Sequence, residues 1–320
     1  MSNARCVPQK NPAMILPLRG LSSPVMNRRT FIESVPAGVA AAAALAGLGR
    51  GASASAQGSS ATTAPSGTPG GFKHSVCRWC YGSMDLRELA RAAKGMGISS
   101  IELLTEPEWK IVQEEGLTCA VANGPTSIGP GFNHPDKHDA IIKSAETLLP
   151  KIRAAGLPMM IVFSGNRGGV SDEVGMQNSV TALKRMMPLA EAANITVVME
   201  LFNSKVDHKD YLADRTHWGV ELVKRVGSDR FRLLYDIYHM QIMEGDVIRT
   251  IQDNHWAINH YHTGGVPGRA EIDSTQELNY PAICRAINAT GFTGFVAQEF
   301  IPRSGDPMKS LAESIKICTV

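Results

Sequence analysis

Four polar residues in the second half of the chain each follow directly on a short apolar run, namely Glu200, Asp236, His262 and Glu299. Such runs are typical of buried parallel strands, whose carboxyl ends meet at one edge of a sheet or one mouth of a barrel. Three carboxylates gathered there without a cation would repel one another and raise their pKa values. A divalent ion removes that conflict, and three carboxylates with one imidazole suit Mn²⁺ or Mg²⁺, with Zn²⁺, Fe²⁺ or Co²⁺ as alternatives. One such carboxylate is often only a helix cap or an ion-pair partner, but four polar residues on successive strands predict a shared metal site.

Three further residues are candidates for binding a substrate. His239 lies three residues after Asp236, so a turn at the strand end would bring its imidazole to a substrate hydroxyl; the alternative is a capping or supporting role. Arg269, on the loop after the seventh apolar run, could hold a substrate oxygen or carboxylate, unless it is an ordinary surface arginine. His208 lies in a loop and could equally have no role.

Two aromatic residues and two cysteines lie close together at the end of the first apolar run. Trp79 and Tyr81 could form an apolar wall over a substrate, but we favour the interpretation that they are aromatic residues of the core. Cys77 and Cys80 form a CxxC pair, and no second pair follows that would complete a structural zinc site. We expect both to be ordinary strand residues, because a redox pair would stand at the start of a helix instead.

Eight apolar runs alternate with amphipathic stretches from residue 73 onward, and these elements would position the side chains above. The predicted strands are His74–Trp79, Ser99–Leu104, Thr118–Asn123, Pro158–Phe163, Ile195–Glu200, Phe231–Asp236, Ala257–His262 and Gly294–Glu299. The predicted helices are Asp85–Lys94, Pro107–Glu115, His138–Ala155, Met176–Ala193, Asp214–Val226, Pro281–Ala289 and Met308–Ile317. Eight strands alternating with helices over ~250 residues favour an α/β fold of the (β/α)₈ TIM-barrel type over an open doubly wound sheet. No GxGxxG follows the first strand, which weakens the dinucleotide-binding version of the open sheet.

The first 56 residues are typical of an export leader rather than of a barrel. Arg28 and Arg29 precede a mildly apolar stretch, Val35–Gly49, and the small residues Ala52–Ala56 suit a signal peptidase. This pattern resembles a twin-arginine export signal, so we expect an exported, periplasmic protein. The alternative is a chance arginine pair before a disordered tail, and Met26 could be the true start. The apolar stretch is too short for a membrane span, which takes ~20 residues.

The remaining boundaries follow from composition. Residues 57–71 are rich in Gly, Ser and Pro and predict a flexible linker, which leaves residues 72–320 for the barrel. Outside residues 1–56 the chain has 26 basic and 29 acidic side chains, a net charge of −3. A slightly acidic domain without a basic stripe argues against nucleic acid as the partner. We therefore expect a small-molecule substrate, no stable membrane span, and a fold compatible with a homodimer formed through the barrel helices.

Several short stretches resemble the xylose isomerase-like barrels, and within them the hydroxypyruvate isomerase and ketose 3-epimerase group. They are Met199–Asn203 (MELFN), Tyr235–His239 (YDIYH), His260–Gly264 (HYHTG), Pro267–Arg269 (PGR) with Glu277–Tyr280 (ELNY), and Ala297–Phe300 (AQEF). The resemblance covers about residues 73–318. The PGR and ELNY stretches are similar to hydroxypyruvate isomerases, whereas His262, where some of those enzymes have Gln, is what the sugar epimerases use.

The resemblance implies that Glu200 and Glu299 both bind the metal and move a proton. Removing a proton from the carbon next to a carbonyl gives an enediolate, whose charge a metal stabilises. Return of the proton to the neighbouring carbon isomerises the substrate, and return to the opposite face of the same carbon epimerises it. The reaction favoured is hydroxypyruvate to tartronate semialdehyde. The alternatives are a ketose or keto-sugar epimerase, isomerase or lyase outside the cytoplasm, and a non-catalytic sugar-binding barrel; phosphodiester hydrolysis is disfavoured because it takes more metal ligands and a basic groove.

Overall fold

The computed structural model describes residues 71–320. The predicted leader, residues 1–56, and the predicted linker, residues 57–71, lie outside the described residues except for Gly71. Among the described residues, no helix combines the length and the apolar character that crossing a membrane requires.

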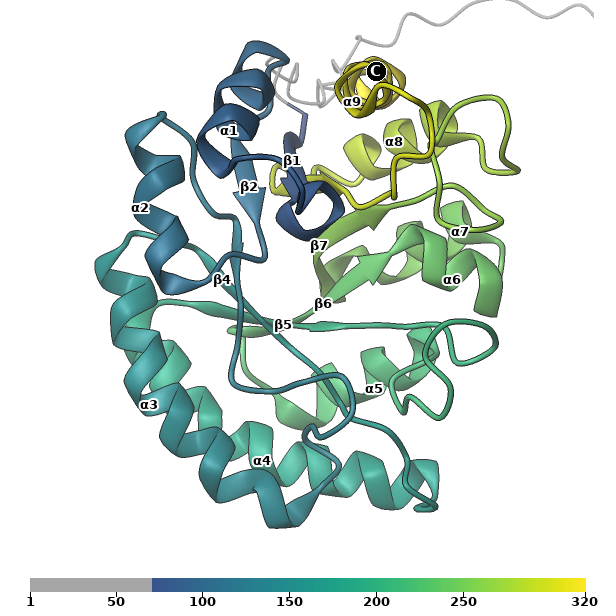
Figure 1. The fold of residues 1–320 in the computed structure, drawn as a ribbon. Coiled ribbons are helices and arrows are strands. Elements are labelled where there is room, and N and C mark those ends of the chain that lie inside the picture. The colour runs from purple at the N-terminus through teal and green to yellow at the C-terminus, as the bar shows by residue number, and fades with distance from the viewer. Residues whose placement is uncertain (1–70) are drawn as a thin grey trace, which may run out of the picture. The chain divides into compact units, whose positions relative to one another are not determined.

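Eight parallel strands form one sheet that curls into a nearly closed barrel (Figure 1). In chain order they are β1 (Lys73–Cys77), β2 (Ser100–Glu102), β3 (Val121–Ala122), β4 (Met159–Val162), β5 (Thr196–Glu200), β6 (Phe231–Asp236), β7 (Ile258–Thr263) and β8 (Phe295–Gln298). The last strand, β8, pairs with β1. β2 and β3 meet through two parallel bridges, Ser100 with Thr118 and Leu104 with Ala122, which bring the two edges of the sheet together. The predicted TIM barrel is confirmed, and the open-sheet alternative is wrong.

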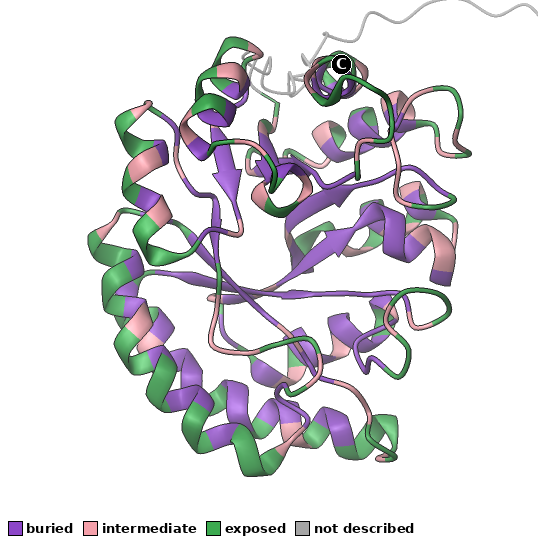
Figure 2. Cartoon of the chain, viewed as in Figure 1, coloured by how far each residue is buried: buried purple, intermediate pink, exposed green. Residues whose placement is uncertain are grey.

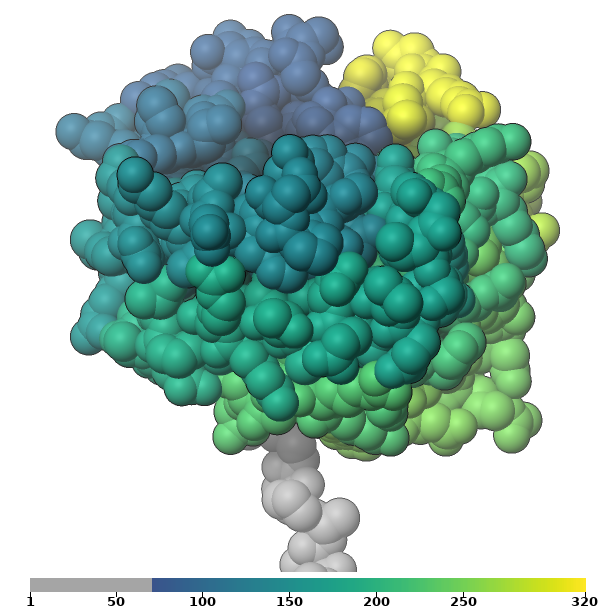
Figure 3. Space-filling model, turned by 90° about the horizontal axis from the view of Figure 1, so that it is seen from below, coloured from purple at the N-terminus to yellow at the C-terminus, as the bar shows by residue number. Residues whose placement is uncertain are grey.

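Helices connect the strands and cover the outside of the barrel (Figures 1 and 2). They are α1 (Leu86–Gly95), α2 (Glu106–Glu114), α3 (His138–Ala154), α4 (Asp172–Ala193), α5 (Thr216–Val226), α6 (Ile237–Met243), α7 (Val247–Asn254), α8 (Tyr280–Ala289) and α9 (Pro307–Cys318), with 3₁₀ turns η1 (Arg78–Tyr81), η2 (Pro135–Lys137) and η3 (His255–Ala257). The blue elements that begin the barrel and the yellow helix α9 lie side by side in Figures 1 and 3, as the pairing of β1 with β8 requires.

The strands are buried on both faces, because helices cover them outside and side chains fill the barrel inside. Figure 2 shows the strands as mostly buried, whereas the helices expose their outer faces. Inside the barrel, further from the carboxyl ends of the strands than Glu200 and Asp236, the side chains form one apolar cluster: Ala120, Val121, Met159, Ile161, Val198, Leu234 and Phe295. Val198 and Leu234 stand two residues before Glu200 and Asp236, so the strand period of two places the polar pair inside the barrel, closer to the carboxyl ends.

Local signals explain which helices could be predicted. Asp85 caps α1 as predicted, because its side chain accepts the backbone N–H groups of Arg87 at 2.9 Å and Glu88 at 3.1 Å. Helices α6 and α7 were not among the predicted helices. α6 begins directly at the end of β6 and is buried almost throughout, so no polar face marks it. Its N-cap is Asp236, whose side chain accepts the backbone N–H of Tyr238 at 2.8 Å, and which was predicted only as a strand end and metal ligand.

β1 ends two residues earlier than predicted, at Cys77. The guanidinium of Arg78 donates to the carbonyls of Tyr81 at 2.5 Å and Met84 at 2.9 Å and so stabilises the turn η1. Cys80 therefore lies in a 3₁₀ turn, and the prediction that it is a strand residue is wrong, whereas Cys77 is a buried strand residue as predicted. Both thiols are free in the structure.

Candidate active site

The four polar residues at the strand ends come together at the carboxyl-terminal mouth of the barrel. Glu200 and Asp236 end β5 and β6, His262 is next to last in β7, and Glu299 directly follows β8. All four are buried, and one potential ligand atom from each lies within 4.8 Å of the others. The structure thus brings together the predicted set, and its metal-binding role remains a prediction.

One carboxylate oxygen in this group, Oε1 of Glu200, lacks a hydrogen-bond partner. His262 Nδ1 lies 2.8 Å from Glu299 Oε2 and 3.3 Å from Glu200 Oε1. Glu200 Oε1 is buried, and no hydrogen bond of suitable geometry reaches it. A buried carboxylate oxygen without a donor is costly, and a cation shared by the four residues would satisfy it. The donor set, three carboxylates and one imidazole around that oxygen, therefore fits a divalent metal ion.

The carboxylates differ in their electrostatic surroundings. Burial, and then the negative charge of Glu299, raises the pKa of Glu200 to about 7. Burial also raises the pKa of Asp236 well above its ordinary value, although the nearby Arg269 opposes this. Burial acts on Glu299 in the same sense, but Arg269 and His262 outweigh it and hold the pKa of Glu299 well below its usual range. The expectation that all three pKa values are raised is therefore wrong for Glu299, because a guanidinium and an imidazole lie against it.

Arg269 is part of the site rather than an ordinary surface residue. Its Nη2 lies 3.0 Å from Asp236 Oδ2 and also contacts Glu299 Oε2, and only 12% of its side chain is exposed. The guanidinium also lies over the rings of Trp79 and Tyr238, at 5.2 and 5.3 Å from their centroids. Its N–H groups therefore face the carboxylates at the barrel mouth, where they supply part of the charge balance.

His239 lies in α6, fully buried, behind Asp236 and Arg269. The orientation of Asn203 is fixed because its Oδ1 accepts the backbone N–H groups of Val206 and Asp207. Asn203 Nδ2 therefore faces His239 Nδ1 at 2.7 Å. Nη1 of Arg269, which can only donate, lies 3.1 Å from the other ring nitrogen, Nε2. That nitrogen lies 3.4 Å from Asp236 Oδ2. His239 thus supports residues of the site, and its predicted contact with substrate remains untested.

A cavity of about 420 Å³ opens beside two of the four residues, Glu200 and Glu299, and His208 and Arg269 line it with them. The imidazole of His208 stacks on Phe202, with ring centroids 4.1 Å apart and an interplanar angle of 15°. Burial lowers the pKa of His208, so the ring favours its neutral form. The structure therefore places this loop residue at the wall of the cavity, beside the predicted catalytic carboxylates.

Trp79 also lines this cavity, which corrects the expectation that it is a core aromatic. Its side chain is 45% exposed, and its indole N–H donates to Glu299 Oε1 at 2.8 Å. Tyr81, two residues later, is buried as expected of a core residue. The turn η1 explains the difference, because it directs the two side chains to different surroundings.

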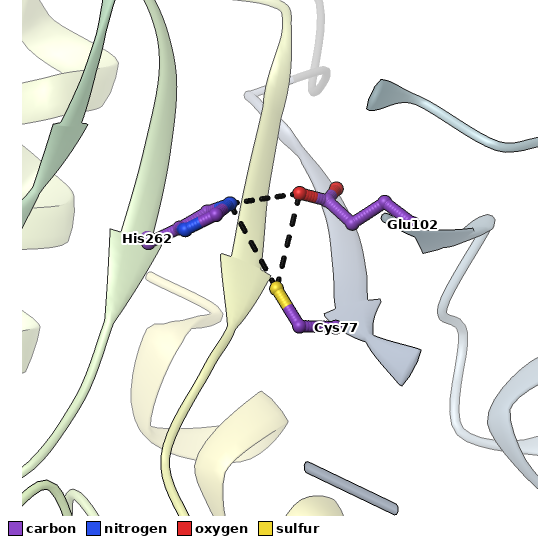
Figure 4. A group of neighbouring side chains, drawn as sticks. All are labelled: Cys77, Glu102 and His262. Atoms are coloured by element: carbon purple, nitrogen blue, oxygen red, sulfur yellow. Dashed lines mark hydrogen bonds and ion pairs between the residues drawn. The ribbon is translucent and has the colours of Figure 1, made fainter. Parts of the chain in front are cut away.

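Two residues of the polar interior were missed from the sequence, Glu102 and His260. Glu102 ends β2, and its Oε1 lies 2.7 Å from His260 Nε2 and 2.8 Å from His262 Nε2. Figure 4 shows Glu102 and Cys77 beside His262. The signal for Glu102 in the sequence was a single glutamate within an apolar strand. The signal for His260 was its position two residues before His262, because that spacing places both imidazoles on the same side of β7.

The comparison with protein families decides the classification. The family model described as "Xylose isomerase-like TIM barrel" matches residues 90–319. The chain belongs to this family. It is 25% identical over 247 residues to the putative hydroxypyruvate isomerase of Homo sapiens, covering 76% of this chain and 83% of the relative. It is 35% identical over 116 residues to a 2-oxo-tetronate isomerase of Cupriavidus necator, a match covering 36% of this chain and 44% of that protein.

Solved structures add a likeness in fold. The 3-keto-D-glucoside 4-epimerase from E. coli superposes with a TM-score of 0.67 at 19% identity, covering 78% of this chain and 100% of that one. At this identity the likeness concerns the fold alone. With relatives named isomerases, this member of the family is an enzyme of the sugar isomerase and epimerase kind.

Proposed function

We propose that this protein is a metal-dependent isomerase of a small hydroxy-carbonyl compound, most simply of hydroxypyruvate to tartronate semialdehyde. The observation that carries the proposal is the buried group of Glu200, Asp236, His262 and Glu299, with an unpartnered carboxylate oxygen beside a cavity. The relatives named hydroxypyruvate isomerase and 2-oxo-tetronate isomerase support the choice of substrate.

The four residues would hold one divalent ion, Mn²⁺ or Mg²⁺ by preference. When bound, such an ion polarises the substrate carbonyl and stabilises the negative charge of an enediolate. Glu200 is suited to take the proton from the carbon beside the carbonyl, because its carboxylate lines the substrate cavity. Glu299 faces the same nitrogen of His262, Nδ1, as Glu200 does, and it is the second candidate for returning the proton.

Arg269 supplies the positive charge of the substrate cavity. Among the described residues that line the cavity of about 420 Å³, it is the only lysine or arginine. Its guanidinium can therefore bind a substrate carboxylate or a developing oxyanion once its present contacts with Asp236 and Glu299 are exchanged. A carboxylate-bearing substrate such as hydroxypyruvate matches that single cation.

A second candidate is a ketose or keto-sugar epimerase, isomerase or lyase. The cavity favours it, because about 420 Å³ falls in the range that encloses drug-sized ligands and exceeds what a three-carbon acid fills. The stacked rings of Phe163, Phe202 and His208 offer an apolar wall for a sugar. Export through the twin-arginine route, expected from the leader, would also place the enzyme with extracytoplasmic sugars.

One experiment tests both candidates. The purified protein is loaded with Mn²⁺ and incubated in deuterium oxide with hydroxypyruvate, with 2-oxo-tetronate and with D-psicose, and deuterium incorporation is followed by NMR. Exchange at the carbon beside the carbonyl together with product formation from hydroxypyruvate supports the first candidate, and exchange from the ketose alone supports the second. A protein that binds these compounds without any exchange is a non-catalytic binding barrel, which contradicts both.

A further inference from the structure

Beneath the four strand-end residues, the barrel interior holds a second buried polar group, formed by Ser75, Cys77, Glu102, His260 and His262. Ser75 and Cys77 stand two residues apart on β1, as His260 and His262 do on β7, so each pair directs its side chains to the same side of its strand. Figure 4 shows Glu102, which ends β2, pointing at His262, with the Cys77 thiol beside both. His262 is the one member shared with the strand-end residues.

Glu102 acts in this group as an acceptor of hydrogen bonds. Its Oε2 accepts from the Ser75 hydroxyl at 2.5 Å, and its Oε1 lies 2.7 Å from His260 Nε2 and 2.8 Å from His262 Nε2. A protonated Oε1 could give its single proton to only one of two imidazoles, so the two contacts together call for imidazole N–H groups that donate to a carboxylate. No lysine or arginine is bonded to Glu102 among the described residues, which leaves these donors to satisfy its charge.

The two nitrogens of His262 consequently face different partners. Nε2 faces Glu102, whereas Nδ1 lies 2.8 Å from Glu299 Oε2 and 3.3 Å from Glu200 Oε1. A histidine that binds a metal through one nitrogen almost always donates the N–H of the other to a carboxylate, a carbonyl or a water, which fixes the tautomer and the ring orientation. His262 has this arrangement, and its free nitrogen faces the carboxylates at the barrel mouth.

We propose that Glu102 is a positioning residue, which holds His262 with a proton on Nε2 so that Nδ1 faces the site formed with Glu200, Asp236 and Glu299. The proposal rests on the metal-dependent function proposed above. Glu102 touches neither the cavity nor the reacting atoms, and it acts only through the imidazole. Its removal should therefore weaken metal binding without removing a ligand.

A second metal ion, held by Cys77, Glu102 and His262, is the alternative for this group, since their ligand atoms also lie within 4.8 Å of one another. The contacts argue against it. The Cys77 sulfur lies 3.9 Å from Glu102 Oε1 and 3.8 Å from His262 Nε2, while the nitrogen and the oxygen are directly hydrogen-bonded at 2.8 Å. An ion held by Cys77, Glu102 and His262 would require His262 Nε2 to carry no proton. If His262 Nδ1 also bound an ion at the strand-end residues, the imidazole would have to lose both of its protons.

The test compares Mn²⁺ binding by the wild type, Glu102→Gln and Cys77→Ser, measured by isothermal titration. Glutamine keeps the size of Glu102 but removes its charge, and we expect the Mn²⁺ affinity to fall by about 10- to 100-fold. Cys77→Ser is the matched control in the same buried group, and its affinity should stay within about twofold of wild type, with one ion bound in both. Undiminished affinity in Glu102→Gln, or a second ion that Cys77→Ser loses, overturns the proposal.

A second measurement does not depend on the folding of any variant. Nitrogen-15 NMR of the wild-type histidines, with diamagnetic Zn²⁺ bound, should show a slowly exchanging proton on Nε2 of His262, and a bare Nε2 overturns the positioning role. Metal binding by the wild type distinguishes failure of the metal-dependent function from failure of the positioning role. A wild type that binds no divalent ion at all removes the metal-dependent function together with this inference, whereas a wild type that binds Mn²⁺ beside an unaffected Glu102→Gln removes the positioning role alone.

Discussion

Nη2 of Arg269 lies 3.0 Å from Oδ2 of Asp236, among the carboxylates that we propose as metal ligands. The same nitrogen contacts Glu299 Oε2. Arg269 therefore balances part of the negative charge that a divalent ion would also balance. Because the metal ion and the guanidinium would bind the same carboxylate oxygens of Asp236 and Glu299, we expect metal binding to release Arg269 toward the cavity.

Replacing Arg269 with Met tests this coupling, since Met keeps much of the length and removes the charge. We expect Mn²⁺ to bind at least as tightly as in wild type, because a competing positive charge has gone. The kcat/KM should nevertheless fall by about 100-fold, because a donor to the substrate oxyanion is lost. Titration calorimetry and steady-state kinetics measure the two effects. A loss of Mn²⁺ affinity as large as that of Asp236→Asn would show that Arg269 supports the ion instead of competing with it.

Trp79→Phe removes one donor from Glu299 and keeps an aromatic ring near Arg269. The indole N–H bonds a carboxylate at 2.8 Å, so we expect kcat/KM to fall about tenfold, the equivalent of about 1.4 kcal/mol. The melting temperature should change little, because the side chain is 45% exposed. Trp256→Phe is the matched control, since Trp256 is also 45% exposed and is remote from the cavity. Equal kinetics for the two variants would remove Trp79 from the catalytic site.

The affinity for Mn²⁺ should rise with pH between about 5 and 7. Burial raises the pKa of Glu200 to about 7, so below that pH a bound ion must displace its proton. Each displaced proton contributes up to about a tenfold change in affinity per pH unit. Titrations with Mn²⁺ at several pH values measure this slope, and an affinity independent of pH over this range would show that Glu200 is not a ligand.

Glu200→Gln should stabilise the ion-free protein at high pH while abolishing turnover. The pKa of Glu200 is raised from an ordinary value of 4.5 to about 7, so the wild type loses stability as the pH rises through that window. At pH 8 the variant should unfold with a free energy higher by at most about 3 kcal/mol, and the difference should shrink toward pH 5. Urea unfolding at both pH values measures it. A stability difference between Glu200→Gln and wild type that is the same at both pH values would mean that the fold does not disfavour the charge on Glu200.

The barrel and its four strand-end residues could be predicted because both follow from a local pattern. An apolar run that ends in a polar residue marks a buried strand and its carboxyl end, and eight such runs alternating with helices specify the ring. Glu200, Asp236 and His262 needed only these rules to be placed at one mouth. The family resemblance added the expected chemistry but no geometry.

The remaining residues depend on contacts between distant parts of the chain. The position of Arg269 is set by its loop, in which its own φ is +56° and Gly265 bonds the carbonyl of Ala270. Trp79 reaches Glu299 because Arg78 stabilises the turn η1. Neither arrangement leaves a periodic signal in the sequence. Glu102 left one weak signal, a charged residue within an apolar strand. Its role could not be predicted from that signal, because it depends on contacts with His260 and His262 of β7.

The central claim is tested most directly by the metal content of the purified protein, measured by mass spectrometry for wild type, Asp236→Asn and Glu299→Gln. The account predicts close to one equivalent of a divalent metal in the wild type, natively or after incubation with Mn²⁺. It predicts clearly less in both variants, each of which loses a carboxylate of the buried group. A wild type that stays empty in excess Mn²⁺, or variants that retain the full equivalent, would contradict it.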